Sequence, residues 1–218
     1  MPGLRHKDGP GIKKALQKEA LENHQRYLER QNFYKGLGYD IVKERRFIFD
    51  KSQPIFGDIL EVGTGKGHFA LELAKEGYRF TSIDLSEEEQ KFAKLNLDYF
   101  GLKDRVNFRI ENAEHLSFKD RSFDLIFSIN TVHHLENPFK VIDELIRIVS
   151  FEGKIIIADF TEKGLSLMDK IHKQEGRTHQ VGKTGLSDIE KYLTEKGFAV
   201  SRDNSEFQQI LIAYHQII

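Results

Sequence analysis

The chain has 218 residues, and its 33 lysines and arginines nearly balance its 34 aspartates and glutamates, which gives a formal charge of −1. This balance lacks the basic excess of a typical nucleic-acid-binding protein, so we expect no nucleic-acid partner. The absence of cysteine excludes disulfide bonds, thiolate metal ligands and a cysteine nucleophile. No apolar run approaches the ~20 residues of a membrane span, so we expect no membrane partner. The absence of cysteine fits a cytoplasmic protein, which is the location we expect.

The first fifty residues predict helices. Apolar residues recur at roughly helical spacing from Ile12 to Leu28, which predicts a helix over residues 12–35. A second short helix is expected over about 40–50. We therefore expect residues 1–50 to form an N-terminal helical cap and residues 51–218 to form the main domain.

From residue 57 onward, short apolar strands alternate with helices. This alternation predicts parallel pairing in a doubly wound α/β sheet. The expected strands are 59–62, 79–85, 106–110, 123–129 and 154–160, and the expected helices are 69–75, 86–100 and 139–149.

The end of the chain follows a different pattern. Residues 161–185 show no clear periodicity and are expected to form a polar loop. A capping box at 187–190 predicts a helix that stops at Gly197, and two strand-like runs follow at 198–202 and 208–215. These runs are too close together for a crossover helix, so they predict a hairpin. The predicted fold is therefore α/β and Rossmann-like, a doubly wound, seven-stranded, mostly parallel sheet with one antiparallel strand and an N-terminal helical cap.

The glycine-rich segment after the first strand is the most informative motif. Gly63, Gly65 and Gly67 alternate with other residues and open a helix, where free backbone amides can face a negatively charged ligand. A P-loop is excluded because Leu60 stands where its first glycine is required and Gly67 where its serine or threonine is required. A dinucleotide fingerprint is weakened because His68 occupies the position of its third glycine.

A carboxylate ends the next strand. Asp84 lies twenty-one residues after Gly63, where an acid accepts hydrogen bonds from both ribose hydroxyls of an adenosine. Dinucleotide enzymes share this acid, so a nucleotide-dependent oxidoreductase stays open as an alternative. An acid just before the helix that begins at Ser86 also suits the positive end of that helix, without any ligand.

Several further motifs follow in a set order, and together they resemble a known family. The segments are Ile59-Leu60-Glu61-Val62-Gly63-Thr64-Gly65-Lys66-Gly67, Ser82-Ile83-Asp84-Leu85-Ser86, Glu111-Asn112-Ala113-Glu114, Phe123-Asp124-Leu125-Ile126-Phe127-Ser128, and Asn130 through His133-His134-Leu135. This order resembles the class I S-adenosylmethionine-dependent methyltransferases, in particular the small-molecule branch often called type 11. The resemblance covers about residues 57–160.

The resemblance implies that the cofactor is S-adenosylmethionine. It also implies which residues of this chain form the cofactor-binding site. The loop would pass beside the methionine part of the cofactor, with Glu61 near its ammonium group, and Asn112 stands where the family usually has aspartate. Asn130 would approach the sulfonium. The implied cofactor-binding residues are Glu61, Gly63, Thr64, Gly65 and Gly67 around the loop, Asp84 for the ribose, Leu85, Asn112 and Ala113 for the adenine, and Asn130.

The implied reaction is in-line methyl transfer to a small-molecule acceptor. Such a transfer depends mainly on positioning, and a base is needed only when the acceptor carries a proton. His133 and His134 are the candidate bases, because they follow a strand at its ligand-binding end, although one of them can instead pack beneath the cofactor. Because neither is an unambiguous base, a non-catalytic S-adenosylmethionine-binding module is kept as an alternative.

Two further regions bear on the acceptor. His172, Glu175 and His179 would share one helical face as a metal site, but Gly176 interrupts that helix and the spacing matches no standard motif, so we expect no metal. We expect residues 161–185 to cover the substrate, with Arg177 and Lys183 as candidate ligands of an acidic group. The family often uses an N-terminal helix as a lid. Here that region carries Tyr27, Phe33, Tyr34 and Tyr39 beside Lys43, Arg45 and Arg46, which suits a lid or a helix packed on the sheet edge.

Overall fold

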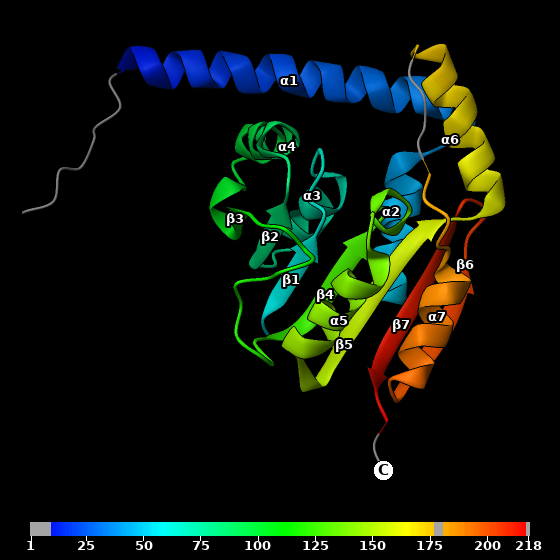
Figure 1. The fold of residues 1–218 in the computed structure, drawn as a ribbon. Helices are drawn as coiled ribbons and strands as arrows, with labels where there is room; N and C mark the ends of the chain where they lie inside the picture. Colours follow the sequence, from blue (N-terminus) through cyan, green and yellow to red (C-terminus); the bar gives the residue numbers. More distant parts are fainter. Residues whose placement is uncertain (1–9, 177–180, 217–218) are drawn as a thin grey trace, which may run out of the picture.

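A computed structural model describes residues 10–176 and 181–216. Seven strands form one sheet in the order β3-β2-β1-β4-β5-β7-β6 (Figure 1). Strand β7 is antiparallel to both of its neighbours, and the other pairings are parallel. The predicted doubly wound sheet with one antiparallel strand is therefore confirmed. The strands are β1 (Ile59–Val62), β2 (Phe80–Asp84), β3 (Val106–Ile110), β4 (Phe123–Ile129), β5 (Val149–Phe160), β6 (Phe198–Asn204) and β7 (Gln208–His215).

Helices cover both faces of the sheet and complete three layers. Helices α2 (Ile41–Lys51), α3 (His68–Lys75) and α4 (Glu87–Tyr99) lie on one face, where α3 buries Phe69 and Leu73 in a core shared with Phe127 of β4. Helices α5 (Pro138–Ile148) and α7 (Leu186–Glu195) lie on the other face, where Leu145 and Ile189 share a second core. Among the described helices, none combines the length and apolar character needed to cross a bilayer.

Two helices cross the end of the sheet toward which the parallel strands point. Figure 1 shows α1 (Pro10–Gly36) running across this end from above α4 to α6 (Glu162–Gln174). Helix α1 is tied to α4 by a buried hydrogen bond of 2.9 Å from Asn23 Nδ2 to Asn96 Oδ1. At its other end, Arg30 forms an ion pair of 3.2 Å with Glu175, just beyond α6. The carboxyl edge of the sheet is thus covered by two helices far apart in sequence.

Helix α6 corrects the expectation of a polar loop over residues 161–185. Thr161 caps its start by accepting a hydrogen bond from the Gly164 amide. Met168 and Ile171 are buried against Tyr34 in a third, smaller core. The periodicity was weakened by Gly164, yet a Cβ at that position would lie 2.3 Å from the Phe207 carbonyl oxygen, so a tertiary contact explains the glycine.

Two of the differences between expected and observed element bounds have a local structural reason. Helix α7 begins at Leu186 instead of after Ser187, because the Asp188 carboxylate accepts a 2.9 Å hydrogen bond from the Gly185 amide. Strand β5 begins at Val149 instead of Lys154, and its pairing with β4 shifts register between Phe123 and Leu125. The register shift lets the strand start earlier than its apolar run.

Candidate functional site

A cavity of about 900 Å³ lies at the carboxyl ends of the parallel strands. Its walls come from the glycine-rich loop, the ends of β2, β4 and β5, the segment after β3, and helices α1, α2 and α6. Ligands in open parallel sheets bind at this edge, so the position agrees with the sequence-based expectation. The predicted site residues that line this cavity are Gly63, Thr64, Gly65, Asp84, Leu85, Asn112, Ala113, Asn130, His133 and His134.

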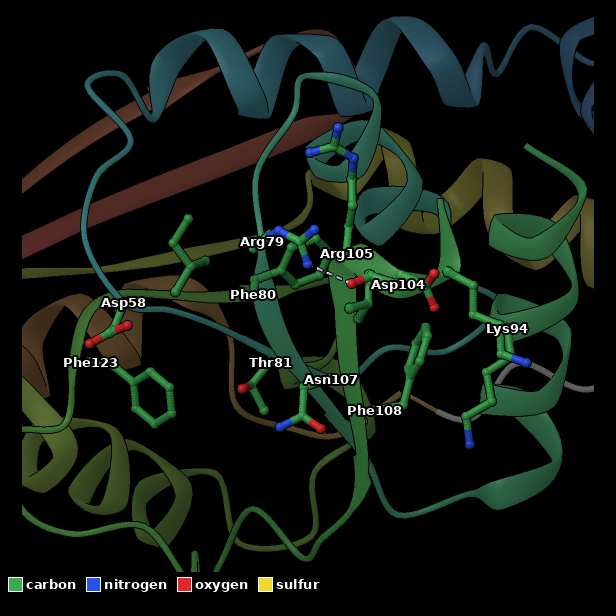
Figure 2. A pocket seen from close by; sticks show the side chains of 13 residues that line it. Asp58, Arg79, Phe80, Thr81, Lys94, Asp104, Arg105, Asn107, Phe108 and Phe123 are labelled. Carbon is green, nitrogen blue, oxygen red and sulfur yellow. Dashed lines mark hydrogen bonds between the residues drawn. The ribbon is translucent and has the colours of Figure 1, made fainter. Parts of the chain in front are cut away.

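A second hollow, of about 690 Å³, lies at the opposite end of the sheet (Figure 2). Its two guanidinium groups donate to backbone carbonyls, Arg79 to Asp104 at 2.8 Å and Arg105 to Gly77 at 2.6 Å. None of the predicted site residues lines it. We therefore place the candidate site in the larger cavity.

The glycine-rich loop has the backbone that its sequence predicts. Gly63, Gly65 and Gly67 all have positive φ angles, of 87°, 49° and 77°. A Cβ on Gly63 would lie 2.3 Å from Thr131 Oγ1, and one on Gly67 would lie 2.6 Å from the Ala93 Cβ. A Cβ on Gly65 would meet no atom within 4 Å, so this glycine leaves space inside the cavity. Two of the glycines therefore allow close packing, and the third opens room for a ligand.

Asp84 joins the loop to the next strand. Its carboxylate accepts hydrogen bonds from the Gly65 amide at 2.7 Å and from the Ser86 amide at 2.8 Å. The side chain is thereby held in the cavity wall with lone pairs left for further donors, as ribose recognition requires. Leu85 beside it is 71% exposed and lies at the rim.

Asn112 and Ala113 lie in the same wall, after β3. Asn112 Oδ1 accepts a 2.9 Å hydrogen bond from the Glu114 amide, which fixes the side chain in a local turn. The second lone pair of this oxygen stays available to an adenine amino group. This arrangement agrees with the adenine-edge role implied by the resemblance.

Glu61 and Gly67 lie outside the cavity wall. Glu61 is buried beneath the loop, where it accepts a 2.5 Å hydrogen bond from Ser82 Oγ, which in turn lies 2.6 Å from Thr64 Oγ1. Burial raises the pKa of the Glu61 carboxyl to about 8. Gly67 begins helix α3 against α4. Glu61 therefore packs beneath the loop, and Gly67 packs against α4. Neither residue lines the cavity.

His133 is fixed at several points beside the cavity. Its ring Nδ1 lies 2.6 Å from Asp159 Oδ1, and its backbone amide donates to Asp159 Oδ2 at 3.0 Å. Its carbonyl oxygen accepts from the Gly182 amide at 2.7 Å. His133 is 5% exposed and Asp159 6% exposed, whereas His134, with its ring centroid 3.9 Å from that of His133, is exposed. Asp159 was not singled out from the sequence, because its partner lies on another strand end.

Arg45 is a second site residue that the sequence did not assign. It extends from α2 into the cavity wall next to Asn130, which has a positive φ of 54°. With the Asn130 amide oxygen turned toward the guanidinium, which can only donate, Arg45 Nη2 lies 2.8 Å from that oxygen. No carboxylate within residues 10–176 and 181–216 forms an ion pair with Arg45. This cation is therefore suited to an anionic group of a ligand.

Only two of the three metal candidates, His172 and Glu175, lie among the described residues. His172 lines the cavity, but Glu175 forms an ion pair with Arg30, and His179 lies outside the described residues, as does Arg177. No group of three ligating side chains that could hold a metal occurs in the part of the chain that is described. Lys183 is exposed and does not line the cavity.

Comparison with known proteins defines the class of this chain. A family model described as a methyltransferase domain matches residues 60–157. Norajmaline N-methyltransferase from Rauvolfia serpentina is 32% identical over 120 residues, covering 55% of this chain and 41% of that protein. Ubiquinone biosynthesis O-methyltransferase from Klebsiella pneumoniae is 26% identical over 149 residues, covering 67% of this chain and 60% of that protein.

Solved structures with the same fold include methyltransferases. A SAM-dependent methyltransferase from Aquifex aeolicus matches with a TM-score of 0.60 and 22% identity over 78% of this chain and 88% of that one. The glycopeptide N-methyltransferase MtfA, solved with S-adenosylmethionine, matches with a TM-score of 0.64 and 14% identity. The match covers 80% of this chain and 94% of that one. The [4+2]-cyclase SpnF matches with a TM-score of 0.66 and 14% sequence identity. The match covers 81% of this chain and 82% of that one.

The matched domain, the sheet order and the glycine-rich loop with its following acid define an S-adenosylmethionine-dependent methyltransferase domain. Residues 60–157 of this chain are those of a class I S-adenosylmethionine-dependent methyltransferase domain. It spans less than two thirds of the length of the two curated relatives named above. The resemblance inferred from the motif order is therefore confirmed.

Proposed function

We propose that this protein transfers a methyl group from S-adenosylmethionine to a small molecule that carries an O–H or N–H group. The observation that carries the proposal is the buried Asp159–His133 pair at the wall of the cavity. The named relatives are an N-methyltransferase and an O-methyltransferase, which supports an acceptor of this kind. The cytoplasmic location stays a prediction.

The cavity residues fit the cofactor. Asp84 presents a carboxylate for the ribose hydroxyls, and the open space above Gly65 admits a ligand backbone. Arg45 supplies a cation for the carboxylate of the methionine part, because the side chains that hydrogen-bond it, Asn130 and Tyr39, are neutral. When bound, S-adenosylmethionine supplies a methyl group activated by its sulfonium.

The protein would contribute position and a base. The Asp159 carboxylate favours the tautomer of His133 with a proton on Nδ1, so Nε2 is the ring nitrogen that accepts a proton from the acceptor. Contacts to the backbone amide and carbonyl of His133 hold the ring in place. His134, which is more exposed, is proposed to contact the acceptor.

The cover of the site would select the acceptor. We propose residues 1–50 as the cap and residues 51–218 as the methyltransferase domain. Within the latter, α6 of the 161–185 segment contributes Met168 and His172 to the cavity, opposite Tyr34 of α1. Aromatic and thioether walls favour a small, largely apolar acceptor over a nucleic acid.

Calorimetry tests the cofactor first. The wild-type protein and Asp84→Ala are titrated with S-adenosylmethionine, S-adenosylhomocysteine and NAD. We expect micromolar binding of the first two ligands, weakened by about tenfold or more in Asp84→Ala, because the ribose loses charge-assisted hydrogen bonds. Asp104→Ala, at the opposite end of the sheet, is the matched control. Binding of NAD alone would contradict the proposal.

Turnover distinguishes transfer from binding alone. Formation of S-adenosylhomocysteine is followed with a panel of phenols, alcohols and amines. We expect product with at least one acceptor class, and a loss of product in His133→Gln. Cofactor binding without product from any acceptor would identify the alternative, a binding module without transferase activity.

A further inference from the structure

A chain of hydrogen bonds links four side chains from separate parts of the fold. Gln208 Nε2, at the start of β7, donates to the Tyr39 hydroxyl at 3.0 Å. With the Asn130 amide oriented as above, Asn130 Nδ2 donates to Gln208 Oε1 at 2.7 Å, and Asn130 Oδ1 accepts from Arg45. Gln208 is fully buried and Tyr39 is 1% exposed. The four side chains therefore form a network at the cavity wall, in which Gln208 is the buried member behind Tyr39, Asn130 and Arg45.

The direction of each bond in this chain is determined by the guanidinium of Arg45. Arg45 can only donate, so Asn130 must present its oxygen to it and its amino group to Gln208. Gln208 must then present its oxygen to Asn130 and its amino group to Tyr39. Burial raises the pKa of the Tyr39 hydroxyl, so it stays neutral and accepts this bond. The side-chain amides of Asn130 and Gln208 therefore each have one orientation in which these hydrogen bonds form.

The surrounding contacts fix Gln208 relative to helix α2. The buried Glu44 carboxylate, next to Arg45 in sequence, accepts a hydrogen bond from the Ser205 hydroxyl. The Ser205 hydroxyl oxygen in turn accepts from the Gln208 amide at 3.0 Å. The start of β7 and the start of α2 are thus joined twice, once through Ser205 and once through Asn130.

We propose that Gln208 is a positioning residue for cofactor binding, which orients Asn130 and through it holds the Arg45 guanidinium toward the cofactor carboxylate. This inference rests on the proposed function, because it takes the ligand of Arg45 to be the amino-acid tail of S-adenosylmethionine. Gln208 itself does not line the cavity. Its effect on the ligand is therefore expected to pass through Arg45, because both of its side-chain partners, Asn130 and Tyr39, form hydrogen bonds with that guanidinium.

Two ligands that differ in this tail isolate the effect. S-adenosylhomocysteine carries the amino-acid tail, and methylthioadenosine has the same thioether nucleoside without it. The affinities of both are measured by calorimetry for the wild type, Gln208→Leu, Arg45→Met and the double variant. Gln209→Leu is the matched control, because Gln209 makes its own hydrogen bond, to the Phe160 carbonyl at 3.0 Å, outside the chain. Thermal unfolding of every variant reports its stability.

We expect Gln208→Leu to weaken S-adenosylhomocysteine binding by about fivefold, and Arg45→Met by about tenfold or more, with methylthioadenosine binding unchanged in both. Gln209→Leu should bind both ligands like the wild type. The double variant should bind like Arg45→Met alone, because a residue that acts only through Arg45 has no effect once Arg45 is removed.

Three results would overturn the inference. One is Gln208→Leu binding S-adenosylhomocysteine as tightly as the wild type, and another is additive losses in the double variant. The third is an equal loss for both ligands, which would indicate a general structural role. If Gln208→Leu does not fold, Tyr39→Phe tests the same network by removing the hydroxyl that contacts both Gln208 and Arg45, and we expect a smaller loss confined to S-adenosylhomocysteine. A wild-type protein that binds neither ligand would instead refute the proposed function.

Discussion

Asp159 binds His133 through both of its carboxylate oxygens, one at the ring Nδ1 and one at the backbone amide. The two residues come from different strand ends, since His133 follows β4 and Asp159 lies near the end of β5. Because β4 and β5 are paired in parallel, their carboxyl ends bring the two residues together. The sheet itself thus sets the orientation of the proposed base.

Replacing Asp159 by asparagine should impair transfer more than binding. An amide cannot stabilise the charged ring and no longer favours the Nδ1-protonated tautomer, so we expect the methyl-transfer rate to fall by about 100-fold. Nitrogen-15 NMR of labelled histidine should show the tautomer change without any acceptor. Asp143→Asn, which alters a surface pairing with Lys196, is the matched control. An unchanged tautomer in Asp159→Asn would contradict the assignment.

Alanine should be tolerated differently at two glycines of the same loop. Gly67→Ala places a Cβ against Ala93 at a positive φ, so we expect the free energy of unfolding to fall by about 2–4 kcal/mol. Gly65→Ala meets no atom, so only the φ cost of about 1–2 kcal/mol is expected. Urea denaturation measures both. Equal losses would show that packing against α4 is not what requires Gly67.

Acid should destabilise the fold partly through His68. Burial lowers the pKa of His68 to about 3 in the folded state, and its ring stacks on Tyr27 of α1 at 5.1 Å. Its stabilising contribution is therefore complete above the ordinary pKa of 6.5 and is lost as pH falls toward 3. His68→Phe should flatten the pH dependence of unfolding in this window, by at most about 1.4 kcal/mol per pH unit. Parallel curves for the two proteins would refute this assignment.

Glu61 should give stability a pH dependence opposite in sign to that of His68, and Glu61→Gln tests it. The folded-state pKa of Glu61 is raised from 4.5 to about 8, so its contribution is complete below pH 4.5 and is lost as pH rises through 8. Glutamine keeps an oxygen for the Ser82 hydroxyl and does not titrate. The stability of Glu61→Gln relative to the wild type should therefore increase from pH 4.5 to 8, as measured by urea denaturation at fixed pH. A constant difference across this range would mean that Glu61 is already ionised in the fold.

The sequence predicted those parts of the fold that local pattern determines. Strands 59–62 and 123–129 have the expected bounds, because short, mostly apolar runs between turns identify buried strands. Helix α6 was missed because Gly164 is required by the carbonyl of Phe207, a contact that no local pattern reveals. The hydrogen bond between Glu61 and Ser82 of β2 is likewise a tertiary contact that no local pattern reveals, and a role of Glu61 toward the cofactor ammonium group stays a prediction.

Some residues of the candidate site belong to a recognisable sequence motif. Others are brought to the site only by tertiary structure, and the sequence analysis did not assign them. Asp84 and the loop glycines follow from spacing along one strand–helix unit. Arg45, Asp159 and Gln208 reach the site from α2, β5 and β7, and their partners are distant in sequence. Isolated arginine, aspartate and glutamine residues carry no signature of that role.

The position of β7 gives the order in which the sheet can be completed. Strand β6 pairs only with β7, and β7 alone joins it to β5. During synthesis, a chain that has emerged only as far as residue 204 has no strand with which β6 can pair, so the last two strands must be added together. Because Gln208 opens β7, the same event places the final member of the hydrogen-bond chain that ends at Arg45. A ribosome-bound chain short of β7 would therefore lack the last two strand pairings of the sheet and the hydrogen bonds of Gln208, so we expect cofactor capture through Arg45 only after β7 has joined the sheet.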